Sequence, residues 1–237
     1  MSDFETDGYA PLGALLSPEQ VRALLAEELR FRPPLGYGTR VNRTLRVAVQ
    51  LCDRSEPVRR AAVQGPHIPA VTGLVGADVC LTHVQFVTKL PDQAEGDVSH
   101  SDIPWHQDSG YGRLDPPEDL TVFFALTDMT EENGCLQVVP GSHRSGLHAH
   151  DASGINPVLQ ETAPRGDAIP VPLRAGEALA FSGLLIHGSG ANRGSEARIA
   201  FYTRYCAPWV RMMSEGGKPV LEDAHSWMVA GEARDAR

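Results

Sequence analysis

The chain has 237 residues, of which 42% are hydrophobic, and it carries 30 acidic against 21 basic residues for a net charge of −9. This hydrophobic fraction suffices for a packed core and excludes a disordered chain. The excess of acid argues against a nucleic-acid backbone as the main partner, because phosphate binding needs clustered basic side chains. Only two of the basic residues are lysines, Lys89 and Lys218, so each of them needs an explanation.

The start of the chain and its cysteines indicate a compartment. The opening residues 1–10 lack the basic start and the apolar core of a signal peptide, and no apolar run approaches the length of a membrane span. The cysteines form no Cys-x-x-Cys pair, which argues against a zinc ribbon and a redox dithiol and favours small core residues. We therefore expect a cytoplasmic protein with reduced thiols and no membrane partner. The four cysteines are Cys52, Cys80, Cys135 and Cys206.

A helix is clearly signalled near the start of the chain. Ser17 is suited to the N-cap, Pro18 to the first helical position, and Gln20 completes a capping box. The residues Arg32-Pro33-Pro34 end this helix. Apolar side chains at helical spacing predict its buried face: Val21, Leu24, Leu25 and Leu29.

A second helical region is expected over residues 57–74, with an interruption near Gly65-Pro66. After that point the pattern is typical of short β-strands separated by turn residues, which predicts a sandwich or barrel. No linker divides the chain, so we expect one domain over residues 1–237, with a core over about 4–205 and a polar tail over 214–237. The expected strands are 79–90, 120–126, 135–139, 168–173, 178–181, 184–186 and 198–205.

Two His-x-Asp triplets stand close together, at residues 100–102 and 106–108. In an extended segment, residues i and i+2 point to the same side, so either triplet can offer an imidazole and a carboxylate to one metal ion. His187 is the best third ligand, because it ends an apolar run and precedes a turn of small residues. Two histidines and one carboxylate form the facial triad of non-heme Fe(II) oxygenases, which leaves positions open for a co-substrate and O2.

A 2-oxoglutarate co-substrate would bring a distal carboxylate that needs a cation. Arginine suits it best, through two parallel hydrogen bonds. Arg198 begins the strand that follows His187 across a glycine-containing turn, and Ser189 can add a hydroxyl. Strand alternation also places Gln85 and Lys89 on one face of the segment 79–90, where they need polar partners.

Four segments together resemble the phytanoyl-CoA dioxygenase family of Fe(II)- and 2-oxoglutarate-dependent oxygenases, from about residue 4 to residue 205. They are the opening DGYAPLGALLSPEQV, then PWHQD at 104–108, ENGCLQVVPGSH at 132–143, and HGSGAN at 187–192 with Arg198 after it. The resemblance implies a mainly β, cupin-like jelly roll, or double-stranded β-helix, with flanking N-terminal helices.

The resemblance also implies a ligand set and a pocket. It selects His106 and Asp108 as catalytic metal ligands together with His187, and it implies Fe(II), 2-oxoglutarate and O2 as cofactor and co-substrates. Related halogenases replace the carboxylate ligand by a small residue, so Asp108 favours hydroxylase-type chemistry. The residues implied to bind 2-oxoglutarate are Arg198, Ser189, Gln85, Lys89 and Thr121.

The expected function is therefore oxidation of an unactivated C–H bond of a small molecule, by hydroxylation or oxidative cyclisation. Bacterial natural-product tailoring, including sugar-containing antibiotics, is the expected setting. Two alternatives remain: a zinc hydrolase with the same ligands, which would not need Arg198, and a non-catalytic jelly-roll protein that binds a small molecule or metal. The first triplet and the histidines of residues 143–150 are more simply explained as loop residues, and the oligomeric state is not predicted.

Overall fold

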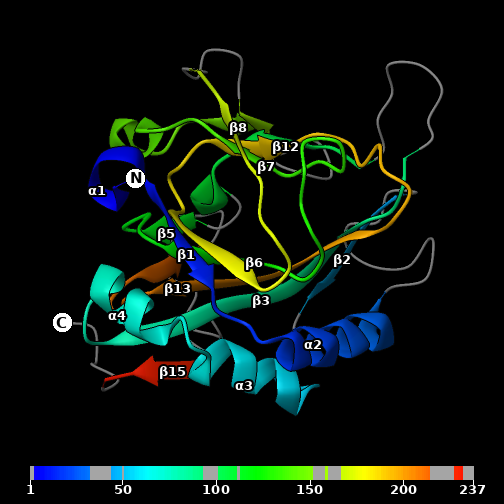
Figure 1. Cartoon of the computed structure of the whole chain (residues 1–237). Coiled ribbons are helices and arrows are strands. Elements are labelled where there is room, and N and C mark those ends of the chain that lie inside the picture. The colour runs from blue at the N-terminus through cyan, green and yellow to red at the C-terminus, as the bar shows by residue number, and fades with distance from the viewer. Residues whose placement is uncertain are drawn as a thin grey trace.

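The structure is a computed structural model of the chain, and it describes residues 3–32, 44–49, 51–92, 101–110, 113–151, 158–159, 167–213 and 227–231. Within these residues two β-sheets face each other, and helices cover the outer side of the larger sheet (Figure 1). No helix of this described part is long and apolar enough to cross a membrane.

The larger sheet contains the long strands. Its strands are β1 (Tyr9–Ala14), β2 (Leu45–Val49), β3 (Val79–Lys89), β6 (Leu120–Ala125), β11 (Glu177–Ser182), β13 (Arg198–Cys206) and β15 (Trp227–Ala230). Their order in space is β1-β11-β6-β13-β3-β15, with every pair antiparallel. Strand β2 pairs with the C-terminal half of β3, and β15 pairs with its N-terminal end.

The smaller sheet has the order β10-β7-β12-β4 and carries the chemistry described below. Its strands are β4 (Ile103–His106), β7 (Leu136–Val138), β10 (Ile169–Val171) and β12 (His187–Ser189). Two small ribbons complete the described strands, β5 (Arg113–Asp115) with β14 (Arg211–Met213) and β8 (His150–Asp151) with β9 (Val158–Leu159). Short 3-10 turns stand at η1 (Asp108–Gly110) and η2 (Ser142–Ser145).

The four described α-helices are α1 (Phe4–Asp7), α2 (Pro18–Phe31), α3 (Glu56–Gln64) and α4 (Ile68–Val75).

Alternate residues of the large sheet face two different hydrophobic cores, one beneath the helices and one between the two sheets. On β13, Phe201 packs among the residues beneath α2, α3 and α4, whereas Tyr202 faces the residues between the two sheets. This two-layered arrangement with an outer helical layer is the jelly roll that the family resemblance implies.

The helical predictions are confirmed at their ends. Ser17 and Gln20 form both bonds of the capping box, at 3.2 Å and 2.8 Å. The region 57–74 is divided into α3 and α4 at Gly65-Pro66, as expected. The predicted buried face is wrong at Leu29, which is 67% exposed, because the neighbouring Glu28 occupies the position against the sheet.

Six of the seven predicted strands are present, and the strand at 184–186 is wrong. This segment is the turn that carries the chain from β11 in the large sheet to β12 in the small sheet. The N–H of Leu185 donates to the carbonyl of Ser182 (2.8 Å), and the N–H of Ile186 donates to the hydroxyl of Ser142 (2.8 Å). These backbone groups are therefore not available for a strand ladder.

The predicted tail contains an edge strand, β15, that pairs with β3; residues 214–226 and 232–237 lie outside the described residues. All four cysteines are buried and none is in a disulfide, as expected.

Candidate metal centre

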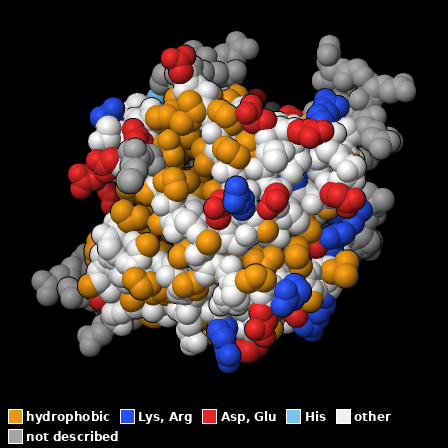
Figure 2. Space-filling view, viewed as in Figure 1, with side chains coloured by type: hydrophobic (Ala, Val, Ile, Leu, Met, Phe, Trp, Pro, Cys, Tyr) orange, Lys and Arg blue, Asp and Glu red, His pale blue; other side chains and the backbone are white. Residues whose placement is uncertain are grey.

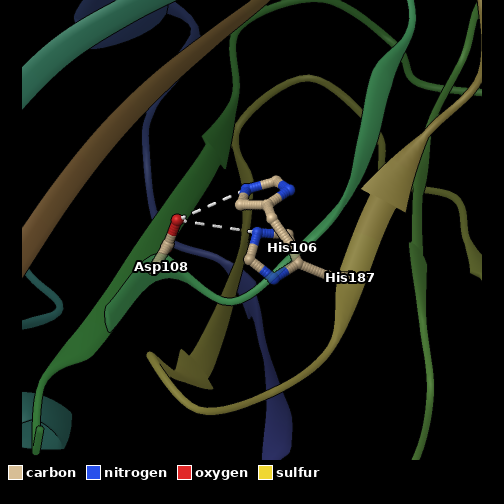
Figure 3. A group of neighbouring side chains, drawn as sticks. All are labelled: His106, Asp108 and His187. Carbon is tan, nitrogen blue, oxygen red and sulfur yellow. Dashed lines mark ion pairs between the residues drawn. The ribbon is translucent and has the colours of Figure 1, made fainter. Parts of the chain in front are cut away.

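Two histidines from neighbouring strands and one aspartate meet inside the molecule. Strand β12 pairs with β4 so that His187 lies directly opposite His106, and Asp108 follows at the start of η1 (Figure 3). The Nε2 atoms of His106 and His187 lie 3.6 Å and 3.7 Å from Oδ1 of Asp108. All three side chains are buried, and one potential ligand atom from each lies within 4.8 Å of the others.

The backbone orients both imidazoles. Nδ1 of His106 donates to the carbonyl of Pro104 (2.7 Å), and Nδ1 of His187 donates to the carbonyl of Leu185 (2.9 Å). With the proton held on Nδ1, each Nε2 presents a lone pair toward Asp108. Burial lowers the pKa of His187 to about 4, and the charge of His106 adds to this effect. Neutral imidazole nitrogens are the form that binds a metal.

The distances from Asp108 to the two imidazoles fit one metal ion. Two atoms that each lie about 2.1 Å from the same ion can be separated by at most about 4.2 Å. The separations of 3.6 Å and 3.7 Å satisfy this limit. A mixed set of two imidazoles and one carboxylate on adjacent short segments is the donor chemistry of a non-heme Fe(II) site.

Asp108 is held in its charged form by its neighbours. Burial alone would raise the pKa of Asp108, but the imidazoles of His187 and His106 in their protonated form, together with the charge of Arg204, hold that pKa well below its usual range. The hydroxyl of Thr121 on β6 donates to Oδ2 of Asp108 (2.6 Å). The other oxygen, Oδ1, is the one that faces the two imidazoles.

A buried ion pair lies beneath the aspartate and was not found from the sequence. Arg204 on β13 donates from Nε to Oδ2 of Asp119 (2.5 Å), and Ser109 donates to the other carboxylate oxygen (2.5 Å). A Cβ at Gly183 would overlap the Asp119 carboxylate, so only glycine fits there. The sequence carries no local signal for this pair, because its members become neighbours only through strand pairing.

Three of the five residues expected to bind 2-oxoglutarate lie close together: Arg198, Lys89 and Ser189. Arg198 lies directly opposite Lys89 in the β13–β3 pair. Nζ of Lys89 donates to Oγ of Ser189 (2.7 Å), to its carbonyl (3.2 Å) and to the carbonyl of Gly190 (2.6 Å). Both cations are buried, with exposed fractions of 0% for Lys89 and 1% for Arg198.

Arg198 has hydrogen-bonding capacity that the described chain does not use. Its guanidinium lies over the ring of Phe123, 5.3 Å from the centroid, and Nε and Nη1 are buried without a hydrogen-bond partner among the described residues. Burial lowers the pKa of Arg198 to about 10, and burial together with the charge of Arg198 lowers the pKa of Lys89 well below its ordinary value. Buried donors without partners, beside a second cation, form a site that favours an anion.

The other two expected residues lie elsewhere on the inner face. Gln85 lies on β3 opposite Tyr202 and is half-buried, four residues from Lys89 on the same face. Thr121 contacts Asp108 instead of the two cations, so the structure places it at the carboxylate ligand.

The histidines at positions 143, 148 and 150 are held by hydrogen bonds near η2, and the one group of three or more potential metal ligands (His, Cys, Asp or Glu) in the described residues is the cluster above. Nε2 of His150 accepts from the N–H of Gln107 (3.0 Å), between the two proposed ligands of β4 and η1. The Gln107 side chain donates to the carbonyls of Gly146 and Leu184. Asp102 is not part of the cluster, and His100 lies outside the described residues.

Residues 4–200 match the family model described as "Phytanoyl-CoA dioxygenase (PhyH)". The chain belongs to the phytanoyl-CoA dioxygenase family. Peroxisomal phytanoyl-CoA dioxygenase of Rattus norvegicus is 25% identical over 228 residues, which are 85% of this chain and 66% of the relative. The human enzyme is 30% identical over 141 residues, which are 56% of this chain and 40% of the relative. The chain thus spans about two thirds or less of these curated relatives.

Solved structures agree on the fold. The epimerase SnoN, in complex with Fe3+, alpha ketoglutarate and nogalamycin RO, has a TM-score of 0.76 at 22% identity and covers 94% of both chains. The non-heme monooxygenase ThoJ has a TM-score of 0.73 at 24% identity, covering 97% of this chain and 82% of its own. The expected family and the expected jelly roll are therefore confirmed.

Proposed function

We propose that this chain is an Fe(II)- and 2-oxoglutarate-dependent oxygenase, with His106, Asp108 and His187 as its metal ligands. One observation carries the proposal: two imidazoles face a single carboxylate oxygen inside a fold that also buries an arginine with unused donors. Family membership and the Fe3+ and alpha ketoglutarate bound by SnoN support it. A zinc hydrolase would have no use for the buried Arg198.

The residues of this chain have separable tasks. His106 and His187 would hold the ion through Nε2, while Thr121 holds Oδ2 of Asp108 so that Oδ1 is left for the metal. An ion held by only these three residues would keep positions free for the keto-acid end of 2-oxoglutarate and for O2. When bound, iron and 2-oxoglutarate would supply the oxidising power for a C–H bond, and the protein would orient the substrate and exclude water.

The distal carboxylate of 2-oxoglutarate would bind at Arg198. The guanidinium can donate two parallel hydrogen bonds to one carboxylate, and its buried Nε and Nη1 atoms have no hydrogen-bond partner among the described residues. Lys89 adds a second positive charge, and Ser189 orients that ammonium through its hydroxyl. The bound anion would relieve the repulsion between two buried cations that lie opposite each other.

We further propose a small-molecule substrate from natural-product biosynthesis, oxidised by hydroxylation or cyclisation. SnoN and the carbocyclase SnoK, which has a TM-score of 0.70 at 21% identity, both come from nogalamycin biosynthesis. Two fungal relatives are described as dioxygenases, FUM3 at 29% identity and aneA at 40% identity over shorter segments. The net charge of −9 also disfavours a nucleic-acid substrate.

Binding measurements under argon test the two halves of the site separately. His106→Ala is expected to weaken Fe(II) binding by more than about 100-fold, because it removes a ligand and not only a supporting group. His148→Ala is the matched control, because His148 is outside the cluster and its imidazole forms a hydrogen bond with the hydroxyl of Ser145. Unchanged metal content in His106→Ala would contradict the proposed metal site.

Arg198→Gln is expected to leave Fe(II) binding intact and to weaken 2-oxoglutarate binding by about 100-fold or more. This loss of affinity follows from the loss of two charged hydrogen bonds of about 1.5–3 kcal/mol each. Equilibrium dialysis of 2-oxoglutarate measures the affinity, and succinate release measures turnover. If the iron-loaded wild-type protein binds no 2-oxoglutarate, the oxygenase proposal is wrong and a zinc hydrolase or a binding protein takes its place.

A further inference from the structure

Three sulfur-containing side chains from three neighbouring strands lie in one row of the large sheet, at the end remote from Arg198. Strand β13 pairs with β3 so that Cys206 lies opposite Cys80, and β15 pairs with β3 so that Met228 also lies opposite Cys80. Directly opposed residues of antiparallel strands point to the same face, with Cβ atoms about 4.5–5.5 Å apart. The row is therefore Cys206, Cys80 and Met228, with Cys80 in the middle.

Two of the three sulfur atoms are in contact. Sγ of Cys80 lies 3.2 Å from Sδ of Met228. The pKa of the Cys206 thiol is raised to about 12, first by burial and then by the negative charge that the opposed Cys80 would carry. Burial likewise raises the pKa of Cys80. Both groups are thus protonated thiols at neutral pH.

The row has a route to solvent. Cys80 and Cys206 are 1% and 0% exposed, whereas Met228 on the edge strand is 36% exposed and covers Cys80. A flexible thioether that lies at the surface and contacts a buried thiol can transfer a soft cation inward. The row shares no residue with the proposed iron ligands.

We infer that Cys80, Cys206 and Met228 form a binding site for a soft monovalent cation, and specifically for Cu(I). Thiolate and thioether sulfurs select Cu(I) over hard cations. Structural zinc sites use four protein ligands, whereas the described residues of this row offer three. Binding leaves copper as Cu(I): each thiol loses one proton, two metal–thiolate bonds form, and both protons pass to the solvent.

Spacing across the strands permits this arrangement. A metal–thiolate bond is about 2.3 Å long, so two sulfurs on one ion lie at most about 4.6 Å apart. Side chains whose Cβ atoms are about 5 Å apart can reach this separation by rotation about χ1 alone. Met228 then supplies a third, neutral sulfur from its present position against Cys80.

Anaerobic competition with the coloured Cu(I)–bicinchoninate complex tests the site on the full-length protein. Wild-type protein is expected to withdraw about one equivalent of Cu(I), and X-ray absorption at the copper edge is expected to show a shell of sulfur neighbours only. Cys80→Ala and Cys206→Ala are each expected to lose that equivalent. Met228→Leu preserves the size and apolar character of the side chain, and it is expected to bind Cu(I) more weakly than wild type.

Two other buried cysteines provide matched controls. Cys52→Ala and Cys135→Ala remove buried thiols that lie outside the row, and both variants are expected still to bind about one equivalent of Cu(I). Circular dichroism of each variant checks that it is folded, and Met228→Leu keeps the test valid if a cysteine variant unfolds. No withdrawal of Cu(I) by wild type, equal uptake in all variants, or a nitrogen shell indicating the imidazoles of His106 and His187 would each overturn the inference.

Discussion

At the scale of single residues, the two oxygens of Asp108 have different surroundings. Oδ1 faces the imidazoles of His106 and His187, and Oδ2 accepts the hydroxyl of Thr121. A carboxylate that is fixed in this way presents one oxygen to an ion in a defined direction. Partners of this kind, which contact a ligand and not the metal, influence affinity through the orientation and charge of that ligand.

Thr121→Val is expected to weaken binding of Fe(II), or of Co(II) as a stable substitute, by about 10- to 100-fold. Valine has the shape of threonine but lacks the hydroxyl, so Oδ2 of Asp108 would be buried without its donor. Thr121→Ser keeps the hydroxyl and is expected to bind nearly as well as wild type. Competition with a metal-sensitive dye measures both affinities, and equal affinity in Thr121→Val and wild type would show that the hydroxyl has no orienting role.

At the scale of elements, the sequence predicts what depends on local pattern. The capping box at Ser17, the division of α3 from α4 and the long strand β3 all follow from neighbours in the chain. Strand β1 was missed because its proline and glycine are poor strand formers that an edge position tolerates. The Arg198–Lys89 pair was partly predictable, because alternation fixes the face of each strand.

What the sequence does not supply is the register between distant strands. Arg204 and Asp119 meet only because β13 pairs with β6 and brings Arg204 opposite Thr121. The same limit applies to Cys206 and Cys80, which are far apart in the chain and opposed in the sheet. A histidine-x-aspartate motif, by contrast, carries its geometry within three residues.

Helix α2 is fixed to β3 by a buried carboxylate. Glu28 accepts two hydrogen bonds from Arg32, at 2.7 Å and 2.5 Å, and a third from Thr88 on β3 (2.6 Å). Thr88 immediately precedes Lys89, so this contact restrains the strand that carries the ammonium group. The position of Glu28 on the inner side of α2 also explains why Leu29 is left exposed.

Glu28→Ala is expected to lower the free energy of unfolding by about 2–3 kcal/mol, because the mutation leaves the buried Thr88 hydroxyl and the Arg32 guanidinium without their acceptor. Glu27→Ala is the matched control on the same helix: Glu27 pairs with the exposed Arg30 at 3.4 Å, and its loss is expected to cost less than about 1 kcal/mol. Urea unfolding measures both. Similar costs for the two variants would mean that Glu28 does not anchor the helix.

At the scale of the whole molecule, a second buried polar contact joins the helical layer to the sheet. The hydroxyl of Tyr205 on β13 donates to the carbonyl of Ala62 in α3 (2.6 Å), and it accepts from Nε2 of His67 (2.5 Å) just before α4. Nδ1 of His67 is buried without a partner among the described residues. A second proton on this ring would therefore point into the apolar core.

Burial accordingly lowers the pKa of His67 from 6.5 to about 4, against a raising contribution from the backbone of Ala62. The unfolded chain binds a proton at this residue near pH 6.5, whereas the folded chain does so only near pH 4. Stability from His67 is therefore complete above pH 6.5, and it decreases as the pH falls from 6.5 toward 4. The decrease is about 2 kcal/mol at pH 5 and about 3 kcal/mol below pH 4.

His67→Gln removes this titration and keeps an N–H donor for Tyr205. The variant is expected to be less stable than wild type at pH 8, because the smaller side chain packs less well against Phe124, whose ring lies 5.0 Å from that of His67. The difference between the two proteins is expected to shrink by about 2 kcal/mol between pH 8 and pH 5, since only wild type loses the contribution of the neutral histidine. Urea unfolding of metal-free protein at both pH values measures the difference, and the titrations of other groups are common to both proteins and cancel. A difference that stays constant with pH would show that His67 titrates normally and that the contact with Tyr205 does not depend on a neutral imidazole.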